Sequence, residues 1–420
     1  MKLGLFVGAA SIAASSFAVT ANAEEISISC GALGIELTLC KDGVKKWEEM
    51  TGNTVKVVST PNSSSERLAL YQQILAAGAG DIDVLQVDVV WPGILGTHFI
   101  DLKPYTQGAQ DDHFQAIVEN NTVDGELKAM PWFTDAGVLF YRKDLLEKYD
   151  RAVPTTWEEM AETARIVQKG EREAGDDDLW GYVFQARAYE GLTCNALEWI
   201  DSYGGEIVDA KGDVVVDSPE VIDAVTEAAS WMKDMVPPGV LNYTEEESRG
   251  VFQSGNAVFM RNWPYAWALA QSDDSPIKGK VGVVALPKGG AEGKHTGVLG
   301  GWNLAVSKYS AHPEIAADLV MFLTSPEEQK RRAIEGSYNP TITDLYQDEE
   351  VLAAVPFFGD LYDTFENAVA RPSGVTGEKY NRVSAAFWGK VHAALEGNED
   401  PETAMSDLAD ELGAVKRRGW

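Results

Sequence analysis

Four short segments of the chain place a tryptophan beside a carboxylate, a guanidinium group or glycine backbone. They are residues 88–91, 130–135, 261–267 and 300–303. This pairing suits a sugar, because a pyranose packs its C–H faces on aromatic rings while its hydroxyl groups bind charged partners for about 1.5–3 kcal/mol each. Glycines at positions 300 and 301 would also let backbone amides approach a ligand closely. A single cluster of this kind more often belongs to the hydrophobic core, but four of them together favour a carbohydrate-binding site.

The common catalytic signatures are absent from the sequence. The motifs HExxH, GxSxG and GxGxxG do not occur. Residues 289–295 imitate a phosphate loop but have one residue too few before the second glycine, and His295 replaces the expected Ser or Thr. The five histidines lie far apart, and the acidic run 176–178 lacks the glycine and distal glutamate of a calcium loop. We therefore expect a protein that is not an enzyme and holds neither cofactor nor metal.

A glycoside hydrolase is the alternative that these absences leave open. The chain has 65 acidic residues, and inspection can neither find nor exclude an acid/base pair among them. Asp88 and Asp135 would be the candidate pair.

The composition sets the number of lobes and the class of partner. At 420 residues the chain exceeds the roughly 250–300 residues at which one hydrophobic core stops growing, which predicts two lobes. The formal net charge is -30, which argues against nucleic acid and anionic lipid surfaces as partners. We expect a neutral or cationic ligand.

The first hundred residues after the N-terminal segment alternate strand and helix patterns. Strands are predicted at 26–32, 54–59 and 84–87, with helices at 40–50 and from the capping box Ser63–Glu66 to residue 77. This order is typical of a parallel sheet covered by helices, whose ligands lie beyond the carboxyl ends of the strands. Asp88 is placed at such an end.

A second α/β run follows, and a third unit resembles a return to the first lobe. The predicted strands are 138–141, 180–185, 280–286 and 303–307, and the predicted helices are 157–169, 219–235 and 313–335. Residues 289–300 are glycine-rich and are expected to form a loop.

Residues 1–23 have the three parts of a secretory signal peptide: a basic start, an apolar run and a small-residue cleavage site. We therefore expect a soluble, exported, periplasmic protein.

The chain contains three cysteines. Cys30 and Cys40 could form a disulfide across one loop or could remain buried thiols, and Cys194 has no remaining cysteine with which to pair if they do.

Longer strings of the chain resemble a known family, the trehalose/maltose-binding proteins of ABC sugar importers. They are residues 135–149, 261–267, 299–302, 307–310 and 366–372. The resemblance covers essentially the whole chain after the signal segment. It implies an α/β, two-lobed periplasmic-binding-protein fold, in which each lobe is a mostly parallel sheet flanked by helices and the ligand cleft lies between the lobes.

The resemblance also implies a set of ligand-binding residues. Asp88 and Asp135 would supply carboxylates, Trp263 and Trp302 would stack on the sugar, and Arg371 would donate to a hydroxyl group. The remaining candidates are amides near Gly300 and Gly301, Arg67 from the second helix, and Glu36 as an acid of the first loop. Phe133 departs from the pattern, because a tyrosine with a hydroxyl group is expected there.

The expected organisation is a signal peptide at 1–23, an N-terminal lobe of 24–134 plus 298–345, and a C-terminal lobe of 135–297 plus 346–420. By this resemblance we expect the protein to be a monomeric substrate-binding subunit that captures an α-linked disaccharide, of trehalose or maltose type, for ABC permease subunits. Besides the hydrolase, a binding protein for a non-carbohydrate ligand, such as a compatible solute or a peptide, remains an alternative.

Overall fold

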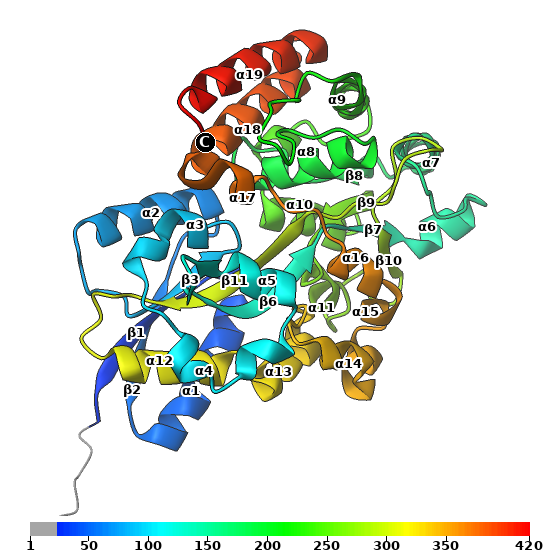
Figure 1. Cartoon of the computed structure of the whole chain (residues 1–420). Helices are drawn as coiled ribbons and strands as arrows, with labels where there is room; N and C mark the ends of the chain where they lie inside the picture. Colours follow the sequence, from blue (N-terminus) through cyan, green and yellow to red (C-terminus); the bar gives the residue numbers. More distant parts are fainter. Residues whose placement is uncertain (1–22) are drawn as a thin grey trace, which may run out of the picture.

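The structure is a computed structural model that describes residues 23–420 and consists of two lobes, each built around its own β-sheet (Figure 1). The predicted signal peptide lies almost wholly outside the described residues. Among residues 23–420, no helix combines the length and the apolar character that crossing a membrane requires.

The first lobe is built on a five-stranded sheet in the order β2-β1-β3-β11-β6. Its strands are β1 Glu25–Cys30, β2 Thr54–Ser59, β3 Val84–Asp88, β6 Met130–Ala136 and β11 Leu299–Val306. The main helices around it are α1 Glu36–Thr51, α2 Ser64–Ala76, α12 Pro313–Leu323 and α13 Pro326–Gly336. In Figure 1, α2 lies on one side of this sheet and α1 and α12 lie on the other. The smaller elements of this lobe are α3 Pro92–Leu95, α4 Lys103–Thr106, α5 Gln115–Asn120, β4 Thr122–Val123 and β5 Glu126–Leu127.

The second lobe is built on a four-stranded sheet in the order β10-β7-β9-β8. Its strands are β7 Val138–Arg142, β8 Trp180–Val183, β9 Ala257–Asn262 and β10 Val281–Ala285. Its helices include α6 Lys143–Lys148, α7 Trp157–Glu173, α8 Glu190–Ser202, α9 Pro219–Trp231, α10 Glu245–Gln253 and α11 Ala266–Ala270. The C-terminal helices α18 Tyr380–Glu396 and α19 Pro401–Lys416 pack with α8 and α9 (Figure 1).

The two-lobed α/β fold confirms the expectation, but the sheets are mixed rather than mostly parallel. In the first sheet β1 runs parallel to β2 and β3, whereas β11 runs antiparallel to both β3 and β6. The reason is the chain path: β6 leaves the first lobe and β11 enters it again, so these neighbours run in opposite directions. In the second sheet only β8 and β9 are parallel, because β7 pairs antiparallel with β9 and β10.

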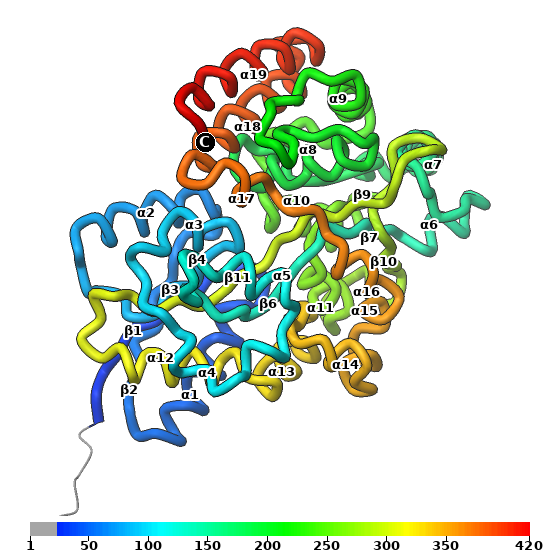
Figure 2. The backbone as a smooth tube through the Cα atoms, in the orientation of Figure 1, coloured from blue at the N-terminus to red at the C-terminus, as the bar shows by residue number. Residues whose placement is uncertain are grey.

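The chain crosses between the lobes at β6–β7, again on the way into β11, and once more after α13, as the continuous tube makes visible (Figure 2). After α13 the short helices α14 Glu349–Ala354, α15 Phe357–Asp360, α16 Tyr362–Glu366 and α17 Ser373–Thr376 lead to α18. Along this segment Val369 bridges Val298, at the entry to β11, with a backbone bond of 2.8 Å from Leu299 to Val369.

Several predicted element boundaries differ from the structure by a few residues, and two of the differences change how a segment is built. The single helix expected over 313–335 is two helices, because Pro326 cannot donate an i→i−4 hydrogen bond, and Ser325 instead caps the new helix by accepting from the Glu328 amide (3.4 Å). The loop expected at 289–300 ends at Leu299, where β11 begins, so Gly300 and Gly301 lie in a strand.

The two predicted capping boxes behave differently. At Thr156 the box is complete, since Glu159 bonds back to the N-cap backbone. At Ser63 only half of it forms: Ser63 caps α2, but the Glu66 carboxylate binds Arg187 of the other lobe at 3.0 Å.

Candidate ligand-binding site

A narrow cavity with a volume of about 50 Å³ lies between the two lobes. Its walls come from the loop before α1, from β3, β6 and β11 in the first lobe, and from α8, α10 and the segment after β9 in the second. Eight of the nine predicted site residues line it: Glu36, Asp88, Asp135, Trp263, Gly300, Gly301, Trp302 and Arg371. The ninth, Arg67, does not.

Trp302 reaches the cavity from β11, where it is paired with Asp88 on β3 and Phe133 on β6. The indole is almost buried, with 9% of its surface exposed, and the edge of Trp91 packs against it at a centroid distance of 5.3 Å. The Arg67 guanidinium lies 4.3 Å from its ring centroid and donates to the Pro61 carbonyl. Arg67 therefore supports the indole. Its Nη1 is buried and has no hydrogen-bond partner among the described residues, and its direct contact with a ligand stays a prediction.

Trp263 reaches the same cavity from the second lobe, directly after β9. The guanidinium of Arg261 lies 3.8 Å from its ring centroid and is held in a fully buried ion pair with Glu198. Gly300 lies against this indole, where an added Cβ would come within 3.0 Å of the ring. Each of the two indoles thus has a guanidinium stacked on it and also lines the cavity.

Five carboxyl groups line the cavity, and three of them, Glu36, Asp135 and Glu245, are not bound to Arg371. Burial, followed by the nearby Glu36, raises the pKa of Asp135 well above its ordinary value, and burial also raises the pKa of Glu245. Asp135 Oδ1 is buried and has no hydrogen-bond partner among the described residues, so it is an acceptor that a ligand can use.

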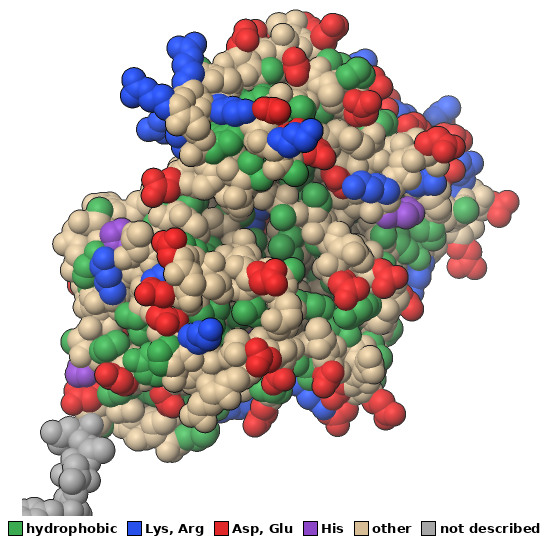
Figure 3. All heavy atoms as spheres, in the orientation of Figure 1, with side chains coloured by type: hydrophobic (Ala, Val, Ile, Leu, Met, Phe, Trp, Pro, Cys, Tyr) green, Lys and Arg blue, Asp and Glu red, His purple; other side chains and the backbone are tan. Residues whose placement is uncertain are grey.

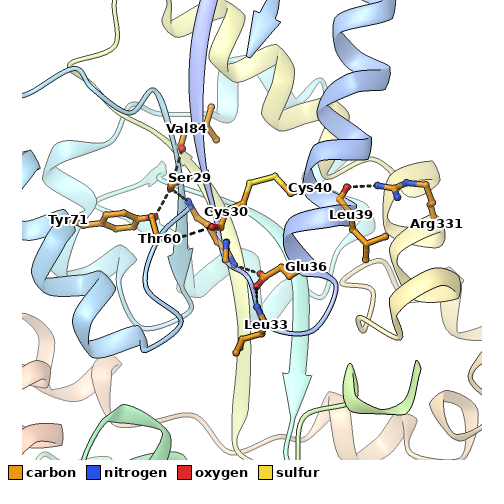
Figure 4. The surroundings of a disulfide bond; sticks show 12 residues. Ser29, Cys30, Leu33, Glu36, Leu39, Cys40, Thr60, Tyr71, Val84 and Arg331 are labelled. Atoms are coloured by element: carbon orange, nitrogen blue, oxygen red, sulfur yellow. Dashed lines mark hydrogen bonds between the residues drawn. A yellow bond between two sulfur atoms is a disulfide. The ribbon is translucent and has the colours of Figure 1, made fainter. Parts of the chain in front are cut away.

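Glu36 sits at the first position of α1, and a disulfide fixes the segment around it. Gln86 Nε2 donates to Glu36 Oε1 at 2.5 Å, and the Leu33 amide lies 3.4 Å from Oε2. Cys30, at the end of β1, is bonded to Cys40 in α1, with 6.6 Å between the Cα atoms (Figure 4). The disulfide alternative for these two cysteines is therefore the one that the structure contains, while Cys194 is a buried free thiol.

Arg371 lies between two carboxylates at the base of the cavity. Nη2 is 2.6 Å from Asp88 Oδ1, and Nη1 is 2.8 Å from Glu190 Oε1. Only Nε remains without a partner among the described residues, and it is buried. Nε is therefore a donor that Arg371 can offer to a ligand, in addition to the second N–H of each Nη atom.

Several lining residues were missed by the sequence analysis, namely Glu190, Cys194, Glu245, Tyr265 and Tyr338. Glu190 and Glu245 are the first residues of α8 and α10. No local motif marks Glu190, and the capping box from Thr244 to Glu247 marks the start of α10 but not a ligand-binding role for Glu245. Tyr265 stands inside the aromatic segment 261–267 and could have been chosen from it.

The departure at Phe133 is not compensated by the neighbouring tyrosines. Phe133 lines the cavity and packs edge-on against Tyr338 with 5.0 Å between the centroids. The Tyr338 hydroxyl donates to the Leu33 carbonyl (2.8 Å), and the Tyr265 hydroxyl donates to Glu246 (2.7 Å). Both hydroxyl groups are thus engaged by protein acceptors.

The cavity is arranged for binding and is poorly arranged for covalent chemistry. Burial raises the pKa of the Cys194 thiol to about 12, which keeps this potential nucleophile neutral. Asp88, one of the two carboxylates of the candidate hydrolytic pair, forms an ion pair with Arg371. Within residues 23–420, no three His, Cys, Asp or Glu side chains gather in a way that could hold a metal ion.

Comparison with known proteins identifies relatives over nearly the full length. The family model for the bacterial extracellular solute-binding proteins matches residues 39–330. A probable ABC transporter-binding protein of Deinococcus radiodurans is 52% identical over 403 residues, which are 95% of this chain and 96% of that protein. A probable amino-acid ABC transporter periplasmic-binding protein of Sinorhizobium fredii is 25% identical over 391 residues, with 90% and 86% of the two chains covered.

Among solved structures, the maltose-bound MalE3 of T. maritima matches with a TM-score of 0.89 and 40% identity. The match covers 94% of this chain and 100% of that chain. These relatives are solute-binding proteins, which confirms the expectation that the chain is not an enzyme.

Proposed function

The chain belongs to the bacterial extracellular solute-binding proteins and is the substrate-binding protein of an ABC transporter, and from this premise we propose that its ligand is an α-linked disaccharide of maltose or trehalose type. The observation that carries the proposal is that two indoles from opposite lobes, Trp302 and Trp263, line one cavity together with the carboxyl groups of Asp88 and Asp135.

The aromatic and polar parts of the wall have separate tasks in this proposal. The indoles pack on the C–H faces of two sugar rings, at about 0.5–1.5 kcal/mol per ring by analogy with aromatic pairs. Asp135 Oδ1 accepts from a hydroxyl group and Arg371 Nε donates to one, since neither atom has a partner among the described residues. Together with Asp88 Oδ2, to which no described residue donates, these contacts suffice for the ~8 kcal/mol of micromolar binding after the cost of association.

An amino acid is a second ligand class to weigh, because of the name of the Sinorhizobium relative. An α-carboxylate needs a free cation or several free donors. The lining residues contain five carboxyl groups, those of Glu36, Asp88, Asp135, Glu190 and Glu245, against the single guanidinium of Arg371, whose two Nη atoms are already bound. This balance favours a neutral polyol over an amino acid.

Transport follows from capture between hinged lobes. We assign 24–134 plus 298–345 to one lobe and 135–297 plus 346–420 to the other, so that the hinge lies in the crossing segments. The ligand closes the lobes by binding the closed arrangement more tightly than the open one, and the permease subunits then receive the closed complex. The proposed compartment is the periplasm, reached through residues 1–23, and the Cys30–Cys40 disulfide is consistent with that oxidising environment.

Isothermal titration calorimetry with maltose, trehalose, glucose and a panel of amino acids tests the ligand class. Binding of maltose or trehalose, with weaker or no binding of glucose and the amino acids, is the expected result. A glucose assay after prolonged incubation with maltose addresses the hydrolase alternative. Tight binding of an amino acid, or release of glucose, would overturn the proposal.

A further inference from the structure

Arg371 joins side chains that belong to different lobes. Asp88 ends β3 in the first lobe, and Glu190 begins α8 in the second (Figure 1). The Arg371 side chain is 2% exposed, and its two carboxylate partners are 8% and 9% exposed. The ion pair with Asp88 therefore spans the gap between the lobes and is shielded from water.

Glu190 is anchored firmly on the second lobe. The Tyr380 hydroxyl donates to Oε1 and the Ser384 hydroxyl donates to Oε2 at 2.6 Å, both from α18. Nη1 of Arg371 also binds Oε1, so Glu190 holds the guanidinium at a fixed place relative to α8 and α18. Burial would lower the pKa of Arg371, but Asp88 and its other neighbours raise it, so the group stays charged.

Asp88 is anchored equally well on the first lobe. Its Oδ1 accepts from the Val90 amide at 3.1 Å, and strand pairing fixes its backbone opposite Trp302. Because both partners of Arg371 are fixed to their own lobes, the 2.6 Å contact with Asp88 is compatible only with a narrow range of lobe arrangements. Opening the lobes would separate this pair.

We propose that Glu190 is a positioning residue for lobe closure: it holds Arg371 where the guanidinium can bind Asp88, and this interlobe bridge populates the closed arrangement before any ligand binds. The bridge uses only Oδ1 of Asp88, and no described residue donates to Oδ2. A ligand can therefore bind Asp88 without breaking the bridge. The predicted change in sugar affinity rests on the proposed function, whereas the predicted opening of the lobes in the ligand-free protein does not.

The exposed interlobe pair offers a matched control. Arg187 binds Glu66 across the same gap at 3.0 Å, but the two side chains are 46% and 54% exposed. Water screens such a pair, so it contributes little to closure. Arg187→Gln removes an interlobe ion pair directly, whereas Glu190→Gln removes the support that the second lobe gives to Arg371; Arg187→Gln therefore leaves the buried bridge intact.

Small-angle X-ray scattering of the ligand-free protein tests the bridge directly. We expect a larger radius of gyration for Glu190→Gln than for the wild type, a return to the wild-type value with saturating maltose, and no change for Arg187→Gln. Glutamine can still bond Tyr380 and Ser384, so the second lobe should remain intact. Arg371→Lys, which is too short to span both carboxylates, should open the ligand-free lobes in the same way if Glu190→Gln folds poorly.

Calorimetry supplies the second readout. A smaller closed population raises the apparent Kd for maltose in proportion, so Glu190→Gln should bind several-fold more weakly than Arg187→Gln. If Glu190→Gln and Arg371→Lys both scatter like the ligand-free wild type, the proposed bridge is wrong. If the wild type binds no maltose, the proposed ligand is wrong, whereas the ligand-free scattering still decides the bridge.

Discussion

The indole of Trp263 lies against the backbone of Gly300, where a Cβ would stand 3.0 Å from ring atom Cζ3. The two residues are brought together from different lobes, because Gly300 lies on β11 and Trp263 follows β9. The missing side chain at position 300 is therefore part of how the cavity wall is built. At Gly301 the reason for glycine differs: φ is +107°, and a Cβ would meet the Phe133 carbonyl at 2.5 Å.

Alanine at position 300 should affect ligand binding, whereas alanine at position 301 should affect folding stability. Gly300→Ala should displace the Trp263 indole by a few tenths of an ångström and weaken maltose binding by about 1 kcal/mol, with little change in melting temperature. Gly301→Ala should lower the free energy of unfolding by about 1–3 kcal/mol, because the backbone conformation and the contact with Phe133 are both unfavourable. Calorimetry and thermal melts separate the two. An affinity change without a stability change at Gly301 would contradict this assignment.

Trp302→Ala should weaken maltose binding by at least about 1 kcal/mol. Since the indole also packs against Trp91, the variant should lose about 3 kcal/mol of folding stability, so circular dichroism must first establish that it is folded. Trp180→Ala is the control: this ring also carries a stacked guanidinium, that of Arg172 at 4.3 Å, but it does not line the cavity. Unchanged affinity in folded Trp302→Ala would refute the proposed stacking.

Maltose binding should release protons from the Asp135 carboxyl group at pH values around its raised pKa. Burial and Glu36 raise the pKa of Asp135 above 3.8, while a hydroxyl group that donates to Oδ1 stabilises the ionised form and lowers that pKa again. Affinity should therefore rise as the pH increases through the raised pKa. Titrations in buffers of different ionisation enthalpy measure the protons released, and Asp135→Asn should release fewer. Proton uptake by the wild type would show that the sign is wrong.

The same shift affects the stability of the ligand-free protein. The folded pKa of Asp135 lies above the unfolded value, so the folded state binds more protons between the two. The contribution of the Asp135 carboxyl group to the free energy of unfolding is fully present below pH 3.8 and is lost as the pH rises through the pKa of the folded state. Asp135→Asn should remove that part of the pH dependence in urea unfolding, and an unchanged profile would contradict it.

Replacing both Cys30 and Cys40 with serine should lower the free energy of unfolding by roughly 2–3 kcal/mol, because the disulfide closes a loop between residues ten positions apart. The same loop carries Leu33 and Glu36 to the cavity wall, so maltose affinity should fall as well. Cys194→Ala keeps the disulfide and serves as the control for general loss of a cysteine. Equal melting temperatures for the double variant and the wild type would contradict a stabilising role.

Much of the fold could be predicted because its signals are local. The strand at 54–59 and the capping box at Thr156 are each specified by residues a few positions apart, and both lie where expected. The break at Pro326 was also visible in the sequence and was overlooked. Strand direction was not predictable in this way, because the antiparallel pairing of β11 depends on the chain returning from the other lobe.

The sequence by itself determined the alternation of strands and helices, and its resemblance to a known family pointed to eight of the residues that line the cavity. The tertiary structure decided which side chains face the cavity and which atoms remain available there. Trp91 and Trp132 are buried in the core while Trp263 and Trp302 line the cavity, Arg67 supports an indole, and both Nη atoms of Arg371 are bound. The physical reason is distance along the chain: Arg371 is separated by 283 positions from Asp88 and by 181 from Glu190, so no local pattern encodes those bonds.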